Sequence, residues 1–259
     1  MQRFIRTLSS AGAALLLMMQ GCAPARAASP QRFSADPIGH NYVVVGGDTL
    51  AVSFLPPAES MRSGRLTQKD FEEVAAELGV EVAAIKAVTE IEAGPGHQGF
   101  WADGKPLINF DLSMYRKRAA RRGVQLNKYT GSHAVIFNRP NTARYGSQQA
   151  AQQARLDAAM SIDSISAIEG TFWGMFQIGG FNYDRCGTRS HAEFVELMSR
   201  SERDQLELFA EFIRRAGLLP ALRAKDWATF ARGYNGPSYA ARGYHTRLAS
   251  SYAKHKARK

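Results

Sequence analysis

Cysteine is nearly absent from this sequence: only Cys22 and Cys186 occur among 259 residues. Small exported domains that depend on disulfides carry several cysteine pairs, so the sequence excludes that class, and the chain must be stabilised by a hydrophobic core. We interpret Cys186 as a small buried apolar side chain rather than a nucleophile.

Long apolar runs are also scarce. The one prominent run, residues 11–19, follows Arg3 and Arg6 and is too short to span a bilayer. A basic start followed by a short apolar run is typical of an export signal, which we place at residues 1–21. No second apolar stretch is available as a transmembrane helix.

Two sites compete for cleavage of this signal. Residues 19–21 with Cys22 resemble a bacterial lipoprotein box with an imperfect first half, whereas Ala25-Arg26-Ala27 resembles an ordinary peptidase site. We favour the first, which implies a lipid at Cys22 and an exported protein anchored in the periplasm or outer envelope.

Histidine is too scattered for a metal centre. The six histidines lack the paired spacing of metal ligands, so the sequence predicts neither a metal site nor a cofactor. We interpret His97, which lies near the candidate acid described below, as a hydrogen-bonding loop residue. The histidines are His40, His97, His133, His191, His245 and His255.

Positive charge is in excess, with a formal net charge of +10. This charge favours a polyanionic partner such as the cell wall, nucleic acid or an anionic membrane surface. The sequence has no nucleic-acid-binding motif and begins with an export signal, so we exclude nucleic acid as a partner. Nothing in the sequence decides the oligomeric state.

The chain divides into four parts. After the signal, residues 22–64 are rich in Pro, Ser and Gly and predict a linker, with one short hairpin where two apolar runs flank a Gly-Gly-Asp turn near residue 47. Residues 65–254 predict one mainly helical domain of the α+β class. Residues 255–259 predict a solvated basic tail.

Caps and apolar periodicity locate most helices of this domain. Thr67 and Asp70 form a capping box for a helix that stops at Gly79, and a Ser190–Glu193 box precedes another helix. We expect helices at about 67–78, 81–93, 151–168, 191–199, 202–216, 227–233 and 239–253. Between them we expect a hairpin over 99–111, turning near Asp103-Gly104, and a long surface loop over 124–153.

One acid falls on the apolar face of a predicted helix. On a wheel of 100° per residue, Glu92 lies with Ile85 and Val88, whereas Glu90 points away and pairs with Lys86. Burying an ionised, unpaired acid costs free energy. We therefore expect one of three arrangements: Glu92 is protonated near neutral pH, it is paired, or it faces a cleft. A carboxyl kept protonated by its surroundings is what a glycosidase uses to protonate a leaving oxygen. The alternative is a structural Glu satisfied by an Arg or a backbone amide.

A second acid is needed across a glycosidic bond, and Asp111 is the best candidate. It follows the second predicted strand and shares a face with Leu107 and Asn109, which lets it border a groove. The alternative is an Asp that caps the next segment.

Two further clusters combine aromatic and amide side chains, which suit the apolar faces and hydroxyl edges of sugars. Such aromatic residues also commonly form a core. The clusters are residues 173–183, with sequence WGMFQIGGFNY, and residues 234–237, with sequence YNGP.

Four motifs in this order resemble the N-acetylmuramidase family of phage endolysins and bacterial envelope proteins, itself similar to goose-type lysozymes and soluble lytic transglycosylases. They are residues 87–94 (AVTEIEAG), 107–111 (LINFD), 173–178 (WGMFQI) and 234–237 (YNGP), within a likeness covering about 66–252. The resemblance implies a lysozyme-like helical fold with a small hairpin beside the cleft, and peptidoglycan as substrate.

By this resemblance, Glu92 is the catalytic acid and Asp111 takes the place of the family's usual second Glu. Gln177, Tyr234 and Asn235 would hold the glycan, with Trp173 and Phe176 shaping the cleft floor. The sequence departs from the family where Asp replaces Glu, where Ala93 replaces the usual Ser, and in a small insertion near 96–97.

These observations favour hydrolysis of the β-1,4 bond between N-acetylmuramic acid and N-acetylglucosamine. Two alternatives remain: a lytic transglycosylase, which would use Glu92 as acid and then base without Asp111, and a lipoprotein that binds peptidoglycan without cleaving it. The separation of the two carboxyls would distinguish a retaining from an inverting hydrolase. The fold alone does not decide whether the enzyme remodels walls, lyses cells or attacks competitors.

Overall fold

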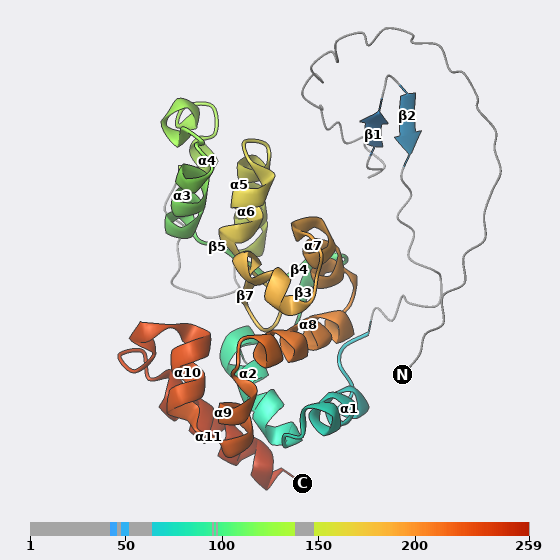
Figure 1. Ribbon diagram of the computed structural model, residues 1–259, viewed down its shortest axis with the longest axis vertical. Helices are drawn as coiled ribbons and strands as arrows, with labels where there is room; N and C mark the ends of the chain where they lie inside the picture. The colour runs from blue at the N-terminus through green and yellow to red at the C-terminus, as the bar shows by residue number, and fades with distance from the viewer. Residues whose placement is uncertain are drawn as a thin grey trace, which may run out of the picture. The chain divides into compact units, whose positions relative to one another are not determined.

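A computed structural model describes residues 42–45, 48–51, 64–94, 96, 98–137 and 148–258 (Figure 1). The chain forms two compact units, residues 1–55 and 56–259. In the first unit, β1 (Tyr42–Val45) pairs antiparallel with β2 (Asp48–Ala51), which confirms the predicted hairpin. The export signal, Cys22 and His97 lie outside the described residues.

The second unit begins with a helix whose ends are both set by local sequence. In α1 (Gln68–Leu78), the Thr67 hydroxyl accepts from the Asp70 amide, and the Asp70 carboxylate accepts from the Thr67 amide. Gly79, at φ 62°, ends the helix in the left-handed conformation that glycine adopts without strain. The predicted capping box and stop are confirmed.

The helix that carries Glu92, α2 (Val82–Ala93), packs along the last helix, α11 (Tyr244–Ala257). Glu90 accepts hydrogen bonds from Ser251, Lys254 and His255. The predicted surface pair between Glu90 and Lys86 is therefore wrong, because a helix wheel omits the partner helix.

The predicted solvated tail also differs from the structure. Helix α11 continues to Ala257, and Lys256 pairs with Glu81 at the start of α2. The basic residues 254–256 thus belong to the helical domain, where they neutralise acids of α2. Charge alone cannot distinguish such residues from a free tail.

The other α-helices are α3 (Leu112–Arg121), α4 (Ala134–Phe137), α5 (Gln149–Met160), α6 (Ser164–Glu169), α7 (His191–Arg200), α8 (Glu202–Arg215), α9 (Leu219–Ala224) and α10 (Trp227–Asn235). Short 3-10 helices are η1 (Leu126–Tyr129), η2 (Gly180–Asn182), η3 (Asp184–Cys186) and η4 (Pro237–Tyr239). Helices α3 and α9 were not predicted.

Three helical predictions need correction. The helix expected over 151–168 is two helices, because Asp163 adopts an extended conformation and caps α6 through the Ser166 amide. The loop expected over 124–153 contains η1, α4 and the first turn of α5. The helix expected from 239 begins at Tyr244, after η4.

The hairpin expected over 99–111 is confirmed only in its first half. Strands β3 (Phe100–Ala102) and β4 (Lys105–Pro106) pair across Asp103-Gly104. β5 (Ile108–Phe110) instead joins β6 (Thr171–Trp173) and β7 (Ile178–Gly179) in a three-stranded antiparallel sheet of order β5-β6-β7. This pairing joins segments about sixty positions apart, which local alternation cannot predict.

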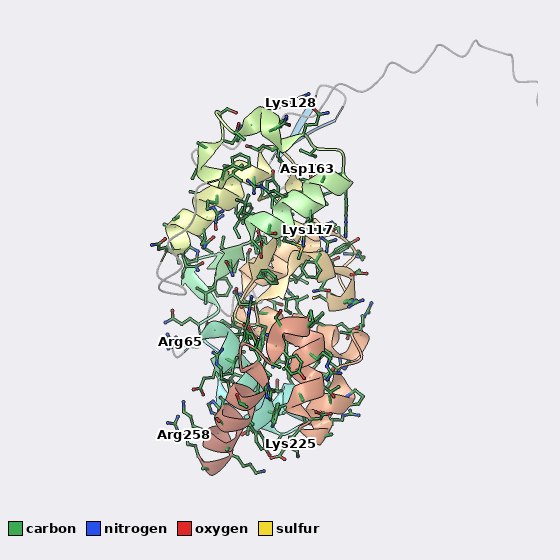
Figure 2. All side chains as sticks on the ribbon, turned by 90° about the vertical axis from the view of Figure 1, so that its left-hand side faces the viewer. Arg65, Lys117, Lys128, Asp163, Lys225 and Arg258 are labelled. Atoms are coloured by element: carbon green, nitrogen blue, oxygen red, sulfur yellow. The ribbon has the colours of Figure 1, made fainter. Side chains whose placement is uncertain are left out.

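Figure 1 shows two groups of helices in the second unit, with the short strands between them. One group contains α3 to α6 and the other contains α1, α2 and α9 to α11. In Figure 2, Lys128 lies at one end of this unit, whereas Lys225 and Arg258 lie at the other. The sheet of β5, β6 and β7 therefore lies where the two groups meet. Strand β5 leads to Asp111, and β6 leads to the turn that carries Gln177.

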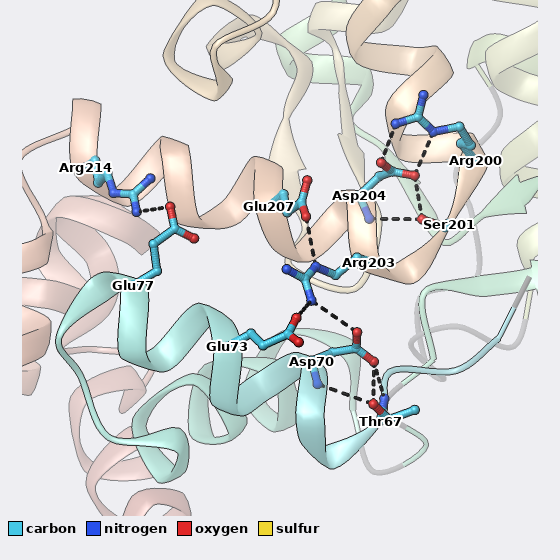
Figure 3. Close-up of polar contacts among 10 residues, drawn as sticks. All are labelled: Thr67, Asp70, Glu73, Glu77, Arg200, Ser201, Arg203, Asp204, Glu207 and Arg214. Atoms are coloured by element: carbon cyan, nitrogen blue, oxygen red, sulfur yellow. Dashed lines mark hydrogen bonds and ion pairs between the residues drawn. The ribbon is translucent and has the colours of Figure 1, made fainter. Parts of the chain in front are cut away.

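Helix α8 holds α1 through an ionic network, drawn in Figure 3. Arg203 contacts Asp70 at 3.2 Å, Glu73 at 2.6 Å and Glu207 at 2.9 Å. The three carboxylates raise the pKa of Arg203, although its partial burial opposes this. One partly exposed guanidinium thus connects the first helix of the domain to α8.

The core is one continuous apolar cluster, within which Phe176 stacks on Phe209 at 4.3 Å between ring centroids. Cys186 is buried in it, and burial raises the pKa of its thiol. This confirms Cys186 as a structural apolar residue. Among the described residues, we find no helix with the length and apolar character needed to cross a membrane.

Candidate functional site

Glu92 occupies the last turn of α2, directly before Ala93 and the terminating Gly94. Its side chain is half-buried, on the side of the helix that also carries the buried Ile85 and Val88. Burial raises the pKa of Glu92 to about 7, opposed by a hydrogen bond from Asn235 and the charge of Arg247. Near neutral pH this carboxyl therefore exists in both protonation states, as a proton donor requires.

Asn235 is the direct partner of Glu92. Its amide Nδ2 donates to Glu92 Oε1 at 2.7 Å, joining the end of α10 to the end of α2 across 143 positions of sequence. The Asn235 carbonyl Oδ1 is buried and has no hydrogen-bond donor among the described residues. If the Asn235 side-chain amide rotated by about 180°, a protonated Glu92 could donate a hydrogen bond to this oxygen. Asn235 can therefore pair with Glu92 in either protonation state.

Tyr234 connects this pair to the aromatic cluster. Its hydroxyl donates to the Phe176 carbonyl at 2.6 Å, and its ring stacks on Phe230 at 5.4 Å between centroids. Tyr234, in the last turn of α10, therefore connects that helix to the turn joining β6 to β7. This arrangement fixes its neighbour Asn235 against Glu92.

Trp173 and Phe176 lie in the core, with exposed fractions of 3% and 0%. The Trp173 indole donates to the Ile168 carbonyl at 3.1 Å. Side chains so buried offer no surface to a sugar, so they support the site through the backbone that they anchor. Both residues therefore fit the alternative interpretation, in which these aromatic side chains belong to the hydrophobic core.

Gln177 lies in the same turn and is half-buried. Its φ of 47° is in the left-handed region, which is uncommon for a residue with a side chain. The side-chain amide donates to the Gly174 carbonyl at 2.8 Å, closing the turn. Within residues 173–178, Gln177 is the one residue that is not buried, so its side chain is the most accessible of this motif.

Asp111 follows β5 and caps α3. Its Oδ1 accepts from the Met114 amide at 2.9 Å, so the capping alternative describes this oxygen. Oδ2 accepts no hydrogen bond within the described part of the chain, and the residue is half-buried. One carboxylate oxygen is thus structural and the other is available to water.

Strand register sets Asp111 apart from the turn that carries Gln177. The Gly174 amide bonds the Leu107 carbonyl at the turn end of the sheet, whereas the Asp111 amide bonds the Gly170 carbonyl at the opposite end. Four residues of strand correspond to roughly 13 Å. The structure joins Glu92, Asn235, Tyr234 and the turn directly, but it joins Asp111 to them only through β5 and β6.

Sequence reasoning missed Arg247, whose positive charge favours the ionised form of Glu92. This residue is exposed on α11, and its guanidinium lies 5.4 Å from the centroid of the Tyr244 ring. It is one of several basic residues in the C-terminal segment. No local pattern distinguished it, because its effect depends on the packing of α11 against α2.

Comparisons with known proteins identify the family of this chain. The N-acetylmuramidase family model matches residues 81–256. A crystal structure of the Burkholderia AP3 phage endolysin is similar, with 36% sequence identity and a TM-score of 0.61, covering 74% of this chain and 71% of the endolysin. A comparison with curated proteins gave no match.

Proposed function

Because the chain belongs to the N-acetylmuramidase family, we propose that it cleaves the β-1,4 bond between N-acetylmuramic acid and N-acetylglucosamine, with Glu92 as the acid. The family makes it a lysozyme-like glycoside hydrolase acting on peptidoglycan. The observation that carries the proposal is the Glu92 carboxyl itself, half-buried at the end of α2 with a pKa raised to about 7 by burial.

In the proposed reaction, Glu92 donates its proton to the glycosidic oxygen while the bond from that oxygen to the anomeric carbon breaks. The Asn235 amide then stabilises the carboxylate that remains, because Nδ2 already lies 2.7 Å from Oε1. Glu92 is regenerated by taking a proton from solvent.

We assign to Asp111 the activation of water rather than nucleophilic attack. A nucleophile in a retaining enzyme lies about 5 Å from the acid, whereas an inverting enzyme leaves room for water between more distant carboxyls. Among the described residues, Asp111 caps α3 through Oδ1 and accepts no bond at Oδ2, and this free oxygen supports the water-activating role. Water would lose a proton to Asp111 and attack the anomeric carbon, giving an inverted reducing end.

The decisive experiment incubates intact sacculi with the purified protein and with Glu92→Gln and Asp111→Asn, and identifies the fragments by mass spectrometry. We expect reducing muropeptides from the wild type and none from Glu92→Gln. Nuclear magnetic resonance of the first-formed anomer then tests inversion. Full activity of Asp111→Asn would remove the second acid from the mechanism.

The same experiment tests the two alternatives. Anhydro products would identify a lytic transglycosylase, which the capping role of Asp111 favours because that reaction needs only Glu92. Binding to sacculi without any released fragment would identify a binding protein and overturn the catalytic proposal.

We also propose that the protein is exported and lipid-anchored at Cys22, as the first 22 residues suggest. Expression in a bacterial host with labelled fatty acid should label the wild type, and Cys22→Ser should abolish both labelling and membrane fractionation. A soluble, unlabelled wild type cleaved after Ala27 would support the ordinary peptidase site instead.

A further inference from the structure

Residues 112–156 contain no Asp or Glu, although the chain as a whole has 23. This stretch forms α3, η1 and α4 and continues into α5. Its basic residues are Arg116, Lys117, Arg118, Arg121, Arg122, Lys128, Arg139, Arg144 and Arg155, of which Arg139 and Arg144 lie outside the described part of the chain. Positive charge is therefore concentrated in the group of helices α3 to α6, where Figure 2 shows Lys117 and Lys128.

Acids of α6 and of the turn before it neutralise only two of these charges. Arg122 pairs with Asp163 at 3.0 Å, and Arg118 pairs with Glu169 at 3.4 Å. Four exposed basic residues form no ion pair within the described part of the chain, and we call them the basic surface: Arg116, Lys117, Arg121 and Lys128. The basic residues at the C-terminus differ, because Lys254 and Lys256 pair with acids of α2.

The basic surface occupies the solvent side of α3 and the neighbouring η1. At 3.6 residues per turn, Arg116, Lys117 and Arg121 fall within an arc of about 140°. Tyr115 and Ala119, which are buried, lie on the opposite side of the helix. The cations therefore point away from the core, and their shared positive potential attracts an external anion.

Two exposed apolar side chains occur in the same group of helices. Val135 in α4 and Met160 at the end of α5 have exposed fractions of 39% and 37%, and no other large hydrophobic residue of the described ranges is as exposed. Apolar side chains beside a basic face are typical of protein surfaces that lie in the interfacial region of a membrane.

Side-chain contacts bring these apolar residues next to the basic surface. His133 Nε2 lies 3.2 Å from Ser161 Oγ, which joins the start of α4 to the end of α5. The rings of Tyr129 and His133 are 5.4 Å apart between centroids, which joins η1 to α4. The guanidinium of Arg116 lies 5.8 Å from the ring centroid of Phe137, the last residue of α4. The cations and the apolar side chains therefore belong to one end of the domain.

We propose that this end of the domain is a contact surface for an anionic phospholipid bilayer. The basic surface binds headgroup phosphates, while Val135 and Met160 enter the boundary between headgroups and acyl chains. A soluble polyanion would use the four charges alone and would leave the two apolar side chains in water. Asp157, which is exposed on α5, weakens the attraction without cancelling it.

This inference goes beyond the proposed function, because none of these residues belongs to the candidate site. It also does not require a lipid at Cys22. A membrane contact through folded side chains is a second means of attachment, which the reversible binding of a single weak anchor leaves room for.

The test measures co-sedimentation of the full chain carrying Cys22→Ser with two kinds of vesicle. One contains phosphatidylglycerol and phosphatidylcholine in equal parts, and the other contains phosphatidylcholine alone. Cys22→Ser removes the proposed lipid attachment, and the neutral vesicles report any binding through the apolar run 11–19. We expect the protein to prefer the anionic vesicles, with an affinity that falls as salt is added.

Two double variants separate charge from apolar contact. Arg121→Gln/Lys128→Gln should bind the anionic vesicles about tenfold more weakly, because each cation near an anionic surface adds to the attraction. Val135→Ser/Met160→Ser keeps the charge and should bind several-fold more weakly. The matched control, Arg185→Gln/Arg242→Gln, removes the same charge from two arginines that are exposed elsewhere and should keep the wild-type affinity.

Equal losses in the control and in Arg121→Gln/Lys128→Gln would show that net charge alone attracts the membrane, and would overturn the inference. Equal binding to neutral and anionic vesicles would overturn it as well. If Arg121→Gln/Lys128→Gln weakens binding of soluble polyphosphate while Val135→Ser/Met160→Ser binds vesicles as the wild type does, the surface is a polyanion site and not a membrane contact. The measurement uses no cleavage, so its failure is distinct from a failure of the proposed function.

Discussion

The amide of Asn235 donates to Oε1 of Glu92, so the residue at the end of α10 helps to set the acidity of the residue at the end of α2. Burial alone would raise the pKa of Glu92 further, and Asn235 and Arg247 limit that rise. The pKa of Glu92 is thus set by desolvation, which raises it, and by one hydrogen bond and the charge of Arg247, which lower it.

This balance predicts the pH dependence of activity. Glu92 must be protonated to act, so kcat/KM should fall as pH rises through about 7. Asn235→Ala and Arg247→Met should each move this alkaline limb to higher pH, because each removes a group that favours the carboxylate. Arg242→Met, an exposed arginine of the same segment, is the control and should leave the limb unchanged. If the alkaline limb stays at the same pH in both variants, a group other than Glu92 controls it.

Glu92 should also lower stability at neutral pH. Its folded pKa, about 7, exceeds the ordinary value of 4.5, so the folded state loses stability relative to the unfolded state as pH rises from about 4.5 through 7. Glu92→Gln should therefore stabilise the protein at pH 8, by at most about 3 kcal/mol, and have little effect at pH 4. Urea unfolding at both pH values measures this. A pH-independent difference would contradict a buried titrating acid.

Glu90 should have the opposite effect on acid stability. Burial opposes its ionisation, but hydrogen bonds from Lys254, Ser251 and His255 hold the pKa of Glu90 at about 2. The folded pKa is below 4.5, so this stabilisation is present above pH 4.5 and is lost as pH falls through 2. Glu90→Gln should lower the free energy of unfolding by roughly 2 kcal/mol at pH 7 and by little at pH 2.

The matched control for Glu90 is Glu196→Gln, an exposed acid on α7. It should change the free energy of unfolding by less than about 0.5 kcal/mol at either pH. If both variants lose the same stability, the contacts between α2 and α11 do not account for the effect.

The two roles of Asp111 can be separated by substitution. Asn is as good an N-cap as Asp, so Asp111→Asn should keep the Tm of the wild type while it removes the carboxylate. Asp111→Ala should lose about 1 kcal/mol of stability in addition, because the Met114 amide loses its acceptor. Thermal unfolding together with the sacculus assay tests this. A large loss of Tm in Asp111→Asn would show that the carboxylate charge itself stabilises the fold.

Features that depend on neighbours a few positions apart could be predicted from the sequence. The Thr67–Asp70 box begins α1, and the stop at Gly79 follows from left-handed backbone geometry. The wheel places Glu92 with Ile85 and Val88 because helical periodicity fixes that face. These predictions hold because hydrogen bonds within a turn do not depend on the rest of the fold.

The pairing of β5 was beyond local reasoning, as were the partners of Glu90. Both depend on segments that are distant in sequence, and alternation in one strand does not identify its neighbour. Aromatic residues such as Phe176 were equally ambiguous, because core and sugar-binding surfaces use the same residue types.

The sequence by itself determined the helical character of the domain, its capped helices and the acid on the apolar face of α2, since each is encoded within a few adjacent turns. Only the tertiary structure decided what surrounds that acid. The Asn235 amide and the Arg247 charge come to Glu92 from α10 and α11. A carboxyl's acidity depends on burial and charge in three dimensions, which the order of residues along the chain does not display.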